Sequence, residues 1–332
     1  MSVSAPLEVR NLTKRFSLGG VAGRSQVHAV DDVSFELRPG TVTALVGESG
    51  SGKSTVARLL AHLYEPTSGL VLFEGGDASK LSGRKEELHY RSQVQMIFQD
   101  PFSSLNPVKT VRHHLERPLR LHHVVPRPQI EERVYELLQT VGLTPPEHIA
   151  EKYPHQLSGG GRQRVAIARA LAVEPKVVLA DEPTSMLDVS IRIGILNLMV
   201  KLKEEHEIAF LYVTHDLAAA RYVADDILVM YAGQIVERGP IEQVLAEPLH
   251  PYTRLLLEAA PDPDTPSPRL EPHAPGAAAV DPVEGCRFLP RCPIAIGVCS
   301  HATPQLVEAR RGQSACCHVT APSTISIERT TP

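Results

Sequence analysis

The sequence predicts an α/β fold with a buried parallel sheet and a phosphate-binding loop after one of its strands. Residues 176–180 and 208–213 are short apolar runs, typical of strands covered on both faces. Residues 41–46 form a third such run, directly before the glycine-rich residues 47–55, which match G-x-x-x-x-G-K-[ST]. A helical pattern follows over residues 56–61. Strand, glycine loop and helix in this order are the context in which the motif binds nucleotide phosphates.

The chemistry of this loop follows from its residue types. Glycines let the backbone curl so that successive N–H groups face an anion, and the helix N-terminus adds its dipole to the same anion. Lys53 is expected to reach the outer phosphates of ATP, and the Ser54 hydroxyl to bind Mg²⁺. The residues expected to bind the nucleotide here are Gly47, Glu48, Ser49, Gly50, Ser51, Gly52, Lys53, Ser54 and Thr55.

The other elements are read from apolar spacing and from turn residues. A small antiparallel sheet is expected to precede the loop, because short strand-like runs flank a glycine-rich stretch. One helix is predicted from apolar residues that recur at helical spacing, and one hairpin is predicted from two runs joined by Ala-Gly. In chain order these elements are the strands 7–12, 29–37 and 69–75, the helix 128–142, and the hairpin strands 227–231 and 234–237.

Two acids end one of the buried strands. Asp181 and Glu182 follow the apolar run 177–180 directly. In a chain with a phosphate-binding loop, this arrangement indicates a second motif of nucleotide hydrolysis. Asp181 is expected to hold Mg²⁺, directly or through water, and Glu182 to orient and deprotonate the attacking water.

Residues 157–165, Leu-Ser-Gly-Gly-Gly-Arg-Gln-Arg-Val, resemble the LSGGQ signature of ATP-binding-cassette (ABC) ATPases. In that family Ser and Gly at a helix N-terminus bind the γ-phosphate held by a second subunit. The resemblance implies that Ser158 and Gly160 complete the site of a partner ATPase in a head-to-tail dimer. This sequence has Gly161 where the family usually has Gln. Glycine is expected to make the helix start more flexible and to destabilise it by about 0.5–1 kcal/mol.

Further family elements occur in order over residues 7–260. The resemblance implies an RecA-like P-loop core with an antiparallel β subdomain and an α-helical subdomain that carries the signature. Gln99 matches a glutamine that contacts Mg²⁺ and reports occupancy to the membrane partner, and His215 matches a histidine that contacts the γ-phosphate. Asp188 matches a residue that faces the opposite subunit. Phe16 stands where the family places an aromatic residue that stacks on adenine, and packing in the sheet is the alternative for this ring.

Residues 98–107 and 250–256 resemble the oligopeptide and dipeptide importers within this family. The implied function is that of an ATP-hydrolysing subunit that powers peptide uptake through two transmembrane permeases, with a second ATPase, identical or homologous, and an extracytoplasmic substrate-binding protein. Import of nickel, glutathione or oligosaccharide is the alternative within the family. A soluble ABC ATPase outside transport is the alternative from another class; such proteins usually carry two cassettes or long insertions.

The five cysteines all lie near the end of the chain. Four of them are spaced C-x5-C-x6-C-x17-C, and a proline follows one directly. This pattern, and its similarity to the tail of peptide-importer ATPases, predicts a [4Fe-4S] cluster. Zn²⁺ and unliganded reduced thiols are the alternatives. The predicted ligands are Cys286, Cys292, Cys299 and Cys317, with Cys316 as a possible substitute for the last.

Composition limits the remaining classes. A net charge of −4 and a pI of about 6.4 argue against a nucleic-acid partner. The N-terminal residues show no signal pattern and no apolar run is long enough to span a membrane, so a place at the cytoplasmic face of the cell membrane is expected. Seven of the 22 residues in 261–282 are proline. A linker is therefore expected there, between an ATP-binding domain at 1–260 and an extension at 261–332.

Overall fold

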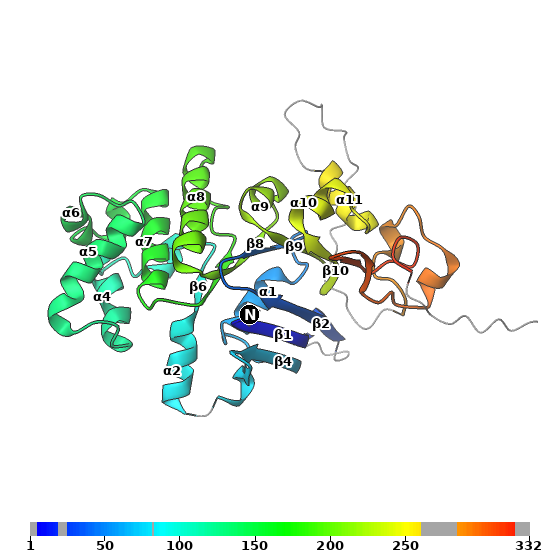
Figure 1. Ribbon diagram of the computed structural model, residues 1–332, viewed down its shortest axis with the longest axis horizontal. Helices are drawn as coiled ribbons and strands as arrows, with labels where there is room; N and C mark the ends of the chain where they lie inside the picture. Colours follow the sequence, from blue (N-terminus) through cyan, green and yellow to red (C-terminus); the bar gives the residue numbers. More distant parts are fainter. Residues whose placement is uncertain (1–4, 19–24, 82, 260–283, 323–332) are drawn as a thin grey trace, which may run out of the picture.

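The computed structural model describes residues 5–18, 25–81, 83–259 and 284–322. It confirms the α/β fold class, with two sheets and helices on both sides of the larger one (Figure 1). The predicted linker, 261–282, lies outside the described residues. The boundary at residue 260 therefore stays a prediction.

The larger sheet has eight strands in the order β11-β12-β10-β9-β3-β8-β7-β6. Its central strands β9, β3, β8, β7 and β6 run parallel, and β9 turns back into β10 through a hairpin in which Tyr231 pairs with Gln234. Every residue of β3, β7 and β8 is buried, as the apolar runs predict. The strands are β3 (Val42–Val46), β6 (Val94–Ile97), β7 (Val177–Asp181), β8 (Ala209–Thr214), β9 (Asp226–Tyr231), β10 (Gln234–Pro240), β11 (Val307–Arg310) and β12 (Gln313–Ala315).

The smaller sheet is antiparallel, in the order β2-β1-β4-β5. Its first two strands extend further than the sequence predicts, because β1 and β2 continue their pairing to Leu18↔Ser25. Helix α1 (Lys53–Leu60) lies between the two sheets, with Val56 and Leu60 in one apolar core with residues of both. The strands are β1 (Leu7–Leu18), β2 (Ser25–Leu37), β4 (Ser68–Phe73) and β5 (Gly76–Asp77).

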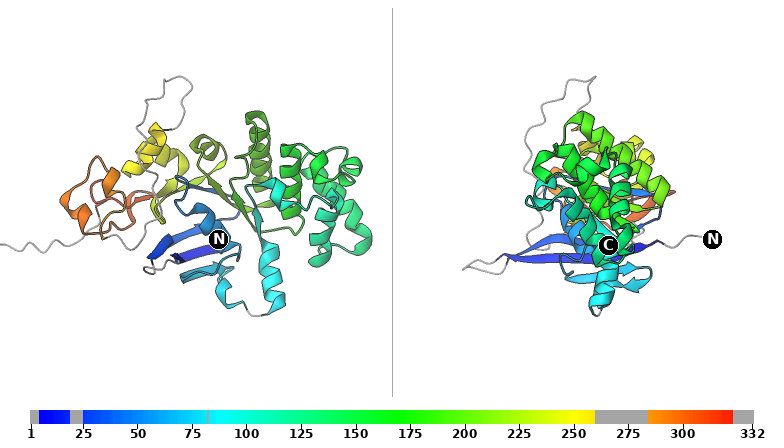
Figure 2. Two further views of the ribbon diagram at one scale, coloured as in Figure 1. Left: turned by 180° about the vertical axis from the view of Figure 1, so that it is seen from behind. Right: turned by 90° about the vertical axis from the view of Figure 1, so that its left-hand side faces the viewer.

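A group of helices forms one end of the molecule. Helices α4, α5 and α7 share an apolar core with α8 and with one face of the larger sheet. Figures 1 and 2 place this group opposite the C-terminal extension, residues 284–322. Besides α1, the α-helices of the described residues are α2 (Arg84–Gln93), α3 (Pro101–Ser104), α4 (Val111–Leu121), α5 (Ile130–Thr140), α6 (Pro146–Ala150), α7 (Gly159–Leu171), α8 (Val189–His206), α9 (Leu217–Val223), α10 (Ile241–Ala246) and α11 (Pro251–Glu258).

The C-terminal extension joins the core directly. Strand β12 pairs with β10, so that β11 and β12 continue the edge of the larger sheet. Phe288 is 2% exposed and packs with Tyr231 and Tyr252 in the core cluster under α10 and α11. Burial of a Phe side chain contributes roughly 1.5–3 kcal/mol, so this contact helps to hold the extension in place.

Candidate nucleotide-hydrolysis site

The larger sheet brings the predicted site residues to one edge. The strands β3, β6, β7 and β8 run parallel, so their carboxyl ends meet at the same edge of the sheet. Their continuations are the glycine loop after Val46, Gln99 after Ile97, Glu182 after Asp181, and His215 after Thr214. Residues far apart in the sequence therefore lie around one cavity.

This cavity has a volume of about 470 Å³. Its lining combines backbone and hydroxyl groups of the loop with one cation, one carboxylate, one amide and one imidazole. It does not include Phe16, Ser158, Gly160 or Asp188, all of which the structure describes. The described lining residues are Ala29, Ser49, Gly50, Gly52, Lys53, Ser54, Thr55, Gln99, Glu182 and His215.

The loop conformation depends on its glycines. Gly47, Gly50 and Gly52 have φ values of 150°, 81° and 107°. A Cβ atom on Gly52 would lie 2.1 Å from the carbonyl oxygen of Ala29, which packs against the loop from β2. Beside Ala29, the Gly233 N–H donates to the Ser51 carbonyl at 2.9 Å. Two neighbouring backbone segments, at Ala29 and at Gly233, therefore fix the curl.

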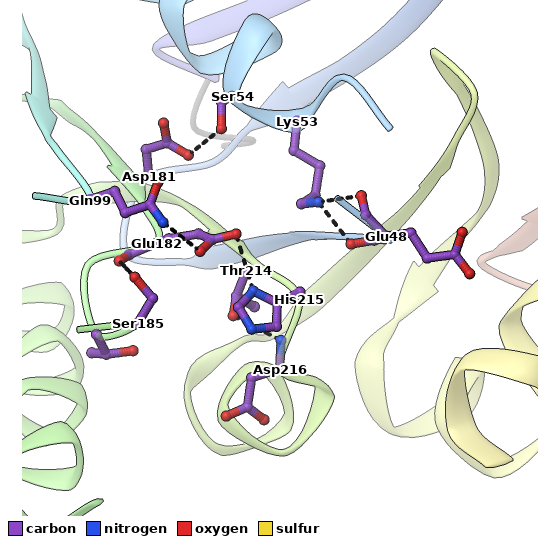
Figure 3. Close-up of polar contacts among 12 residues, drawn as sticks. Glu48, Lys53, Ser54, Gln99, Asp181, Glu182, Ser185, Thr214, His215 and Asp216 are labelled. Atoms are coloured by element: carbon purple, nitrogen blue, oxygen red, sulfur yellow. Dashed lines mark hydrogen bonds and ion pairs between the residues drawn. The ribbon is translucent and has the colours of Figure 1, made fainter. Parts of the chain in front are cut away.

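Lys53 is 5% exposed and lies within the curl of the loop. Its ammonium donates to the carbonyl oxygens of Gly47 and Glu48 at 2.7 and 2.8 Å (Figure 3). Burial lowers the pKa of Lys53, and the carboxylates of Glu182 and Asp181 act in the opposite direction. The amine is thus a buried cation that acidic side chains and carbonyl groups stabilise.

Asp181 and Ser54 bring two possible Mg²⁺-ligand oxygens together, and Ser54 lines the cavity while Asp181 lies behind it. The Ser54 hydroxyl donates to Asp181 Oδ1 at 2.8 Å. Burial raises the pKa of Asp181, which is 2% exposed, so a cation beside it would favour its charged form. One hydroxyl and one carboxylate oxygen fit Mg²⁺, which takes few protein ligands and keeps water and phosphate oxygens as the rest.

Glu182 stands between the two other polar residues of the cavity. The Gln99 amide donates to Glu182 Oε2 at 3.1 Å, and His215 Nδ1 lies 3.1 Å from Glu182 Oε1 (Figure 3). Glu182 has a left-handed φ of 46°, which its N–H stabilises through a 2.9 Å bond to the Val213 carbonyl. Left-handed backbone on a non-glycine residue is uncommon and concentrates at functional positions.

The signature residues lie at a second place. Ser158 is exposed and caps α7, where its hydroxyl oxygen accepts the Gly161 N–H at 3.1 Å. Gly160 is packed so closely against α8 that a Cβ would lie 2.4 Å from Ile191 Cγ2. Asp188 is the N-cap residue of α8. Gly161 also has little room for a side chain, because its Cβ would lie 3.3 Å from Ser158 Oγ.

Phe16 packs away from the cavity lining. Its ring meets Tyr64 edge to face, with the centroids 5.7 Å apart, and the Lys14 ammonium lies 5.1 Å from the ring centroid. Adenine stacking by Phe16 stays a prediction. Tyr252 was not predicted as a site residue, yet its hydroxyl accepts the Glu48 N–H at 2.8 Å. Its burial, at 0% exposed, is what requires a hydrogen-bond partner for the hydroxyl, and the sequence alone does not show that burial.

Comparisons with known proteins agree with this geometry. The family described as "ABC transporter" matches residues 30–185, and "Oligopeptide/dipeptide transporter, C-terminal region" matches residues 236–299. A probable peptide ABC transporter ATP-binding protein of Sinorhizobium fredii is 44% identical over 96% of this chain and 91% of its own. The chain belongs to the family of ABC transporter ATP-binding proteins. It is an ATP-hydrolysing enzyme of the ABC type.

Other relatives of this ABC ATPase point the same way. The di/tripeptide transport ATP-binding protein DppF of Pseudomonas aeruginosa is 44% identical over 94% of this chain and 97% of its own. Among solved structures, the dimeric bacterial ABC transporter cassette MJ0796 is 31% identical, with a TM-score of 0.63, over 71% of this chain and 98% of its own. These matches confirm the ABC ATPase fold.

The cysteines of the ABC ATPase gather in the C-terminal extension. Cys299 and Cys317 are buried, and the Cys286 N–H donates to the Cys299 carbonyl at 2.8 Å. Across the described ranges, however, no group of three or more His, Cys, Asp or Glu residues has the geometry to hold a metal ion. The predicted iron–sulfur or zinc site is thus unsupported as the side chains stand. Cys316 is directed elsewhere, because its thiol donates to the Ile235 carbonyl at 3.3 Å.

Proposed function

We propose that this ATPase powers the import of oligopeptides or dipeptides through two transmembrane permeases, at the cytoplasmic face of the cell membrane. The observation that carries this proposal is the match of residues 236–299 to the C-terminal region of oligopeptide/dipeptide transporters. The nucleotide site does not indicate which cargo is transported, because an ATPase subunit does not contact the cargo. No helix in the described residues has both the length and the apolar character to cross a membrane.

In the proposed mechanism, Lys53 and the loop N–H groups bind the ATP phosphates. Ser54, Asp181 and Gln99 would hold Mg²⁺, which offsets the phosphate charge when bound. Glu182 orients and deprotonates the attacking water, and His215 contacts the γ-phosphate. The 3.1 Å contacts of Glu182 with both Gln99 and His215 support these roles.

We propose a head-to-tail pair of ATPases for the same reaction. Ser158, Gly160 and Asp188 lie outside the cavity that holds the loop, so one chain does not bring both halves of the site together. The N-terminus of α7 would present the Ser158 hydroxyl and nearby N–H groups to the γ-phosphate on the second subunit. The solved cassette MJ0796 is described as a dimer, which supports the pairing.

Purification from native membranes tests the proposal. A tagged chain isolated in mild detergent is expected to bring two multi-spanning permeases, a second ATPase and a substrate-binding protein, identified by mass spectrometry. Recovery of only soluble repair or ribosomal proteins would overturn the transport role. Glutathione is the alternative cargo, because a glutathione import ATP-binding protein of Pectobacterium atrosepticum is 50% identical over 77% of this chain. That match covers 41% of the glutathione relative, whereas the peptide relatives are covered over 91% and 97% of their length, so glutathione has the weaker support.

We also propose a metal centre, a [4Fe-4S] cluster, in the C-terminal extension. Burial raises the pKa of the Cys286 thiol, and neighbouring Cys299, Cys292 and Cys317 raise it further, which supports a shared environment for the four. Anaerobically purified protein is expected to be brown, with a broad band near ~400 nm and about four iron atoms per chain. Colourless protein with one zinc ion per chain would instead support a zinc site. Metal-free protein would refute both metal sites.

A further inference from the structure

The C-terminal extension contacts the glycine loop through an ion pair. Arg291 donates from Nη1 to Glu48 Oε2 at 2.9 Å and from Nη2 to Glu48 Oε1 at 2.8 Å. The two side chains are 12% and 26% exposed. Most surface ion pairs contribute little, but a largely buried, two-point Arg–carboxylate pair is both stronger and fixed in direction.

Aromatic rings hold the guanidinium in this position. Arg291 lies 5.8 Å from the ring centroid of Tyr231 and 5.8 Å from that of Phe288. Both rings are buried, at 6% and 2% exposed. Because cation–π contacts and the carboxylate act on the same planar group, the arginine has little freedom to leave Glu48.

Glu48 transmits this contact to the loop backbone. Its side chain points away from Lys53 in Figure 3, while its carbonyl accepts the Lys53 ammonium at 2.8 Å. Its N–H donates to Tyr252 at 2.8 Å. Side chain, N–H and carbonyl of one residue therefore join the extension, helix α11 and the lysine expected to bind phosphate.

A second arginine of the extension, Arg287, contacts the turn that packs against the glycine loop. Arg287 is 8% exposed and donates to the Asp31 carboxylate and to the Ala232 carbonyl. The residue after Ala232, Gly233, donates its N–H to Ser51 in the loop and accepts the Asp31 N–H, both at 2.9 Å. Arg287 thus stabilises the Ala232–Gly233 turn, which is hydrogen-bonded to the loop.

We propose that Arg291 is a positioning residue for ATP, which acts through Glu48 to hold the glycine loop in its binding conformation. The inference rests on the proposed nucleotide site at that loop. It makes the C-terminal extension a functional part of the ATP site. Arg287 directly follows Cys286, and Arg291 directly precedes Cys292.

The expected signature is a change in affinity and not in chemistry. A loop that is already ordered binds phosphate without a further entropy cost, and a loosened loop must be ordered first. This cost is equal in the ground state and the transition state, so it raises KM for ATP and leaves kcat unchanged. A residue with only a role in folding would not separate the two constants.

The experiment compares Arg291→Ala with Arg310→Ala in the assembled complex. Arg310 is the matched control, because it also joins the extension to the core, through Glu247, but does not reach the loop. Arg291→Ala is expected to raise KM for ATP about tenfold, the scale of one lost charge-assisted hydrogen bond, with kcat within about twofold. Arg291→Lys, which keeps the charge but loses the two-point geometry, should fall between. Equal KM values for the two alanine variants would overturn the proposal.

A second variant keeps the test decisive if Arg291→Ala detaches the extension. Glu48→Ala removes the pair from the loop side and leaves the arginine in place. If the two residues act through each other, the double variant should raise KM no more than the larger single effect. Additive effects would contradict the proposal. If the unmodified chain does not bind ATP, the nucleotide site itself is wrong. If the unmodified chain binds ATP and the Arg291 variant binds it equally well, only the role of Arg291 is wrong.

Discussion

Replacement of Glu182 by glutamine is expected to lower ATP turnover of the assembled complex by about 10²–10⁴-fold, the usual contribution of a positioned general base. Glutamine keeps the shape of the side chain but cannot accept the proton of the attacking water. The carboxylate is the group that contacts Gln99 and His215, at 3.1 Å each, so the change acts at the centre of the polar cluster.

ATP binding should survive this substitution. The backbone of Glu182 is held by the Val213 carbonyl and not by the side chain, so the left-handed conformation does not depend on the carboxylate. The Glu182 charge also faces the site that receives the phosphates, and its removal reduces repulsion of ATP. We therefore expect unchanged or tighter binding and a closed ATPase pair that persists because hydrolysis is blocked.

Steady-state ATPase activity, equilibrium ATP binding and size-exclusion chromatography with ATP check this prediction together. Glu36→Gln is the matched control, since Glu36 is exposed on β2 and away from the cavity. It should change none of the three. Full turnover in Glu182→Gln would remove Glu182 from the reaction and with it the assignment of the acidic strand end.

The central strands and the hydrolysis cavity could be predicted from the sequence because their signals are local. The buried strands β3, β7 and β8 are apolar throughout, and each leads directly into a chemically distinct residue. Parallel strands then bring those residues to one edge by topology alone. Lys53 and Glu182 can therefore be assigned to one site from their motifs, and His215 joins them through the resemblance to ABC ATPases.

The contacts of the extension could not be predicted in the same way. Glu48 and Arg291 are 243 positions apart, and no periodicity links an acid in a loop to an arginine in a short 3₁₀ turn. The pairing of β12 with β10 is equally hidden, because β12 is three residues long and two of them, Gln313 and Ser314, are polar. Both are tertiary contacts, as is the packing of Phe288 against Tyr231 and Tyr252.

Replacement of Gly52 by alanine is the second change for which a large effect is expected. At φ 107° a Cβ atom would lie 2.1 Å from the Ala29 carbonyl and 2.8 Å from Met230 Cε. The first contact is with backbone, which cannot rotate aside as a side chain can. The loop itself must therefore shift. Because hydrogen bonds tolerate only a few tenths of an ångström in donor–acceptor distance, the loop N–H groups then no longer converge on phosphate.

We expect Gly52→Ala to weaken ATP binding at least about 100-fold, since both a steric clash and left-handed strain of about 1–2 kcal/mol oppose the native loop. Gly50→Ala separates the two causes. Gly50 has a φ of 81° but open space around a Cβ, so only the strain applies, and a loss of about tenfold is expected. Gly297→Ala, which meets no atom within 4 Å, should leave binding unchanged. Calorimetric ATP titration of the three folded variants measures the order. If Gly52→Ala bound ATP as well as Gly297→Ala, phosphate recognition would have to be assigned to groups other than the loop.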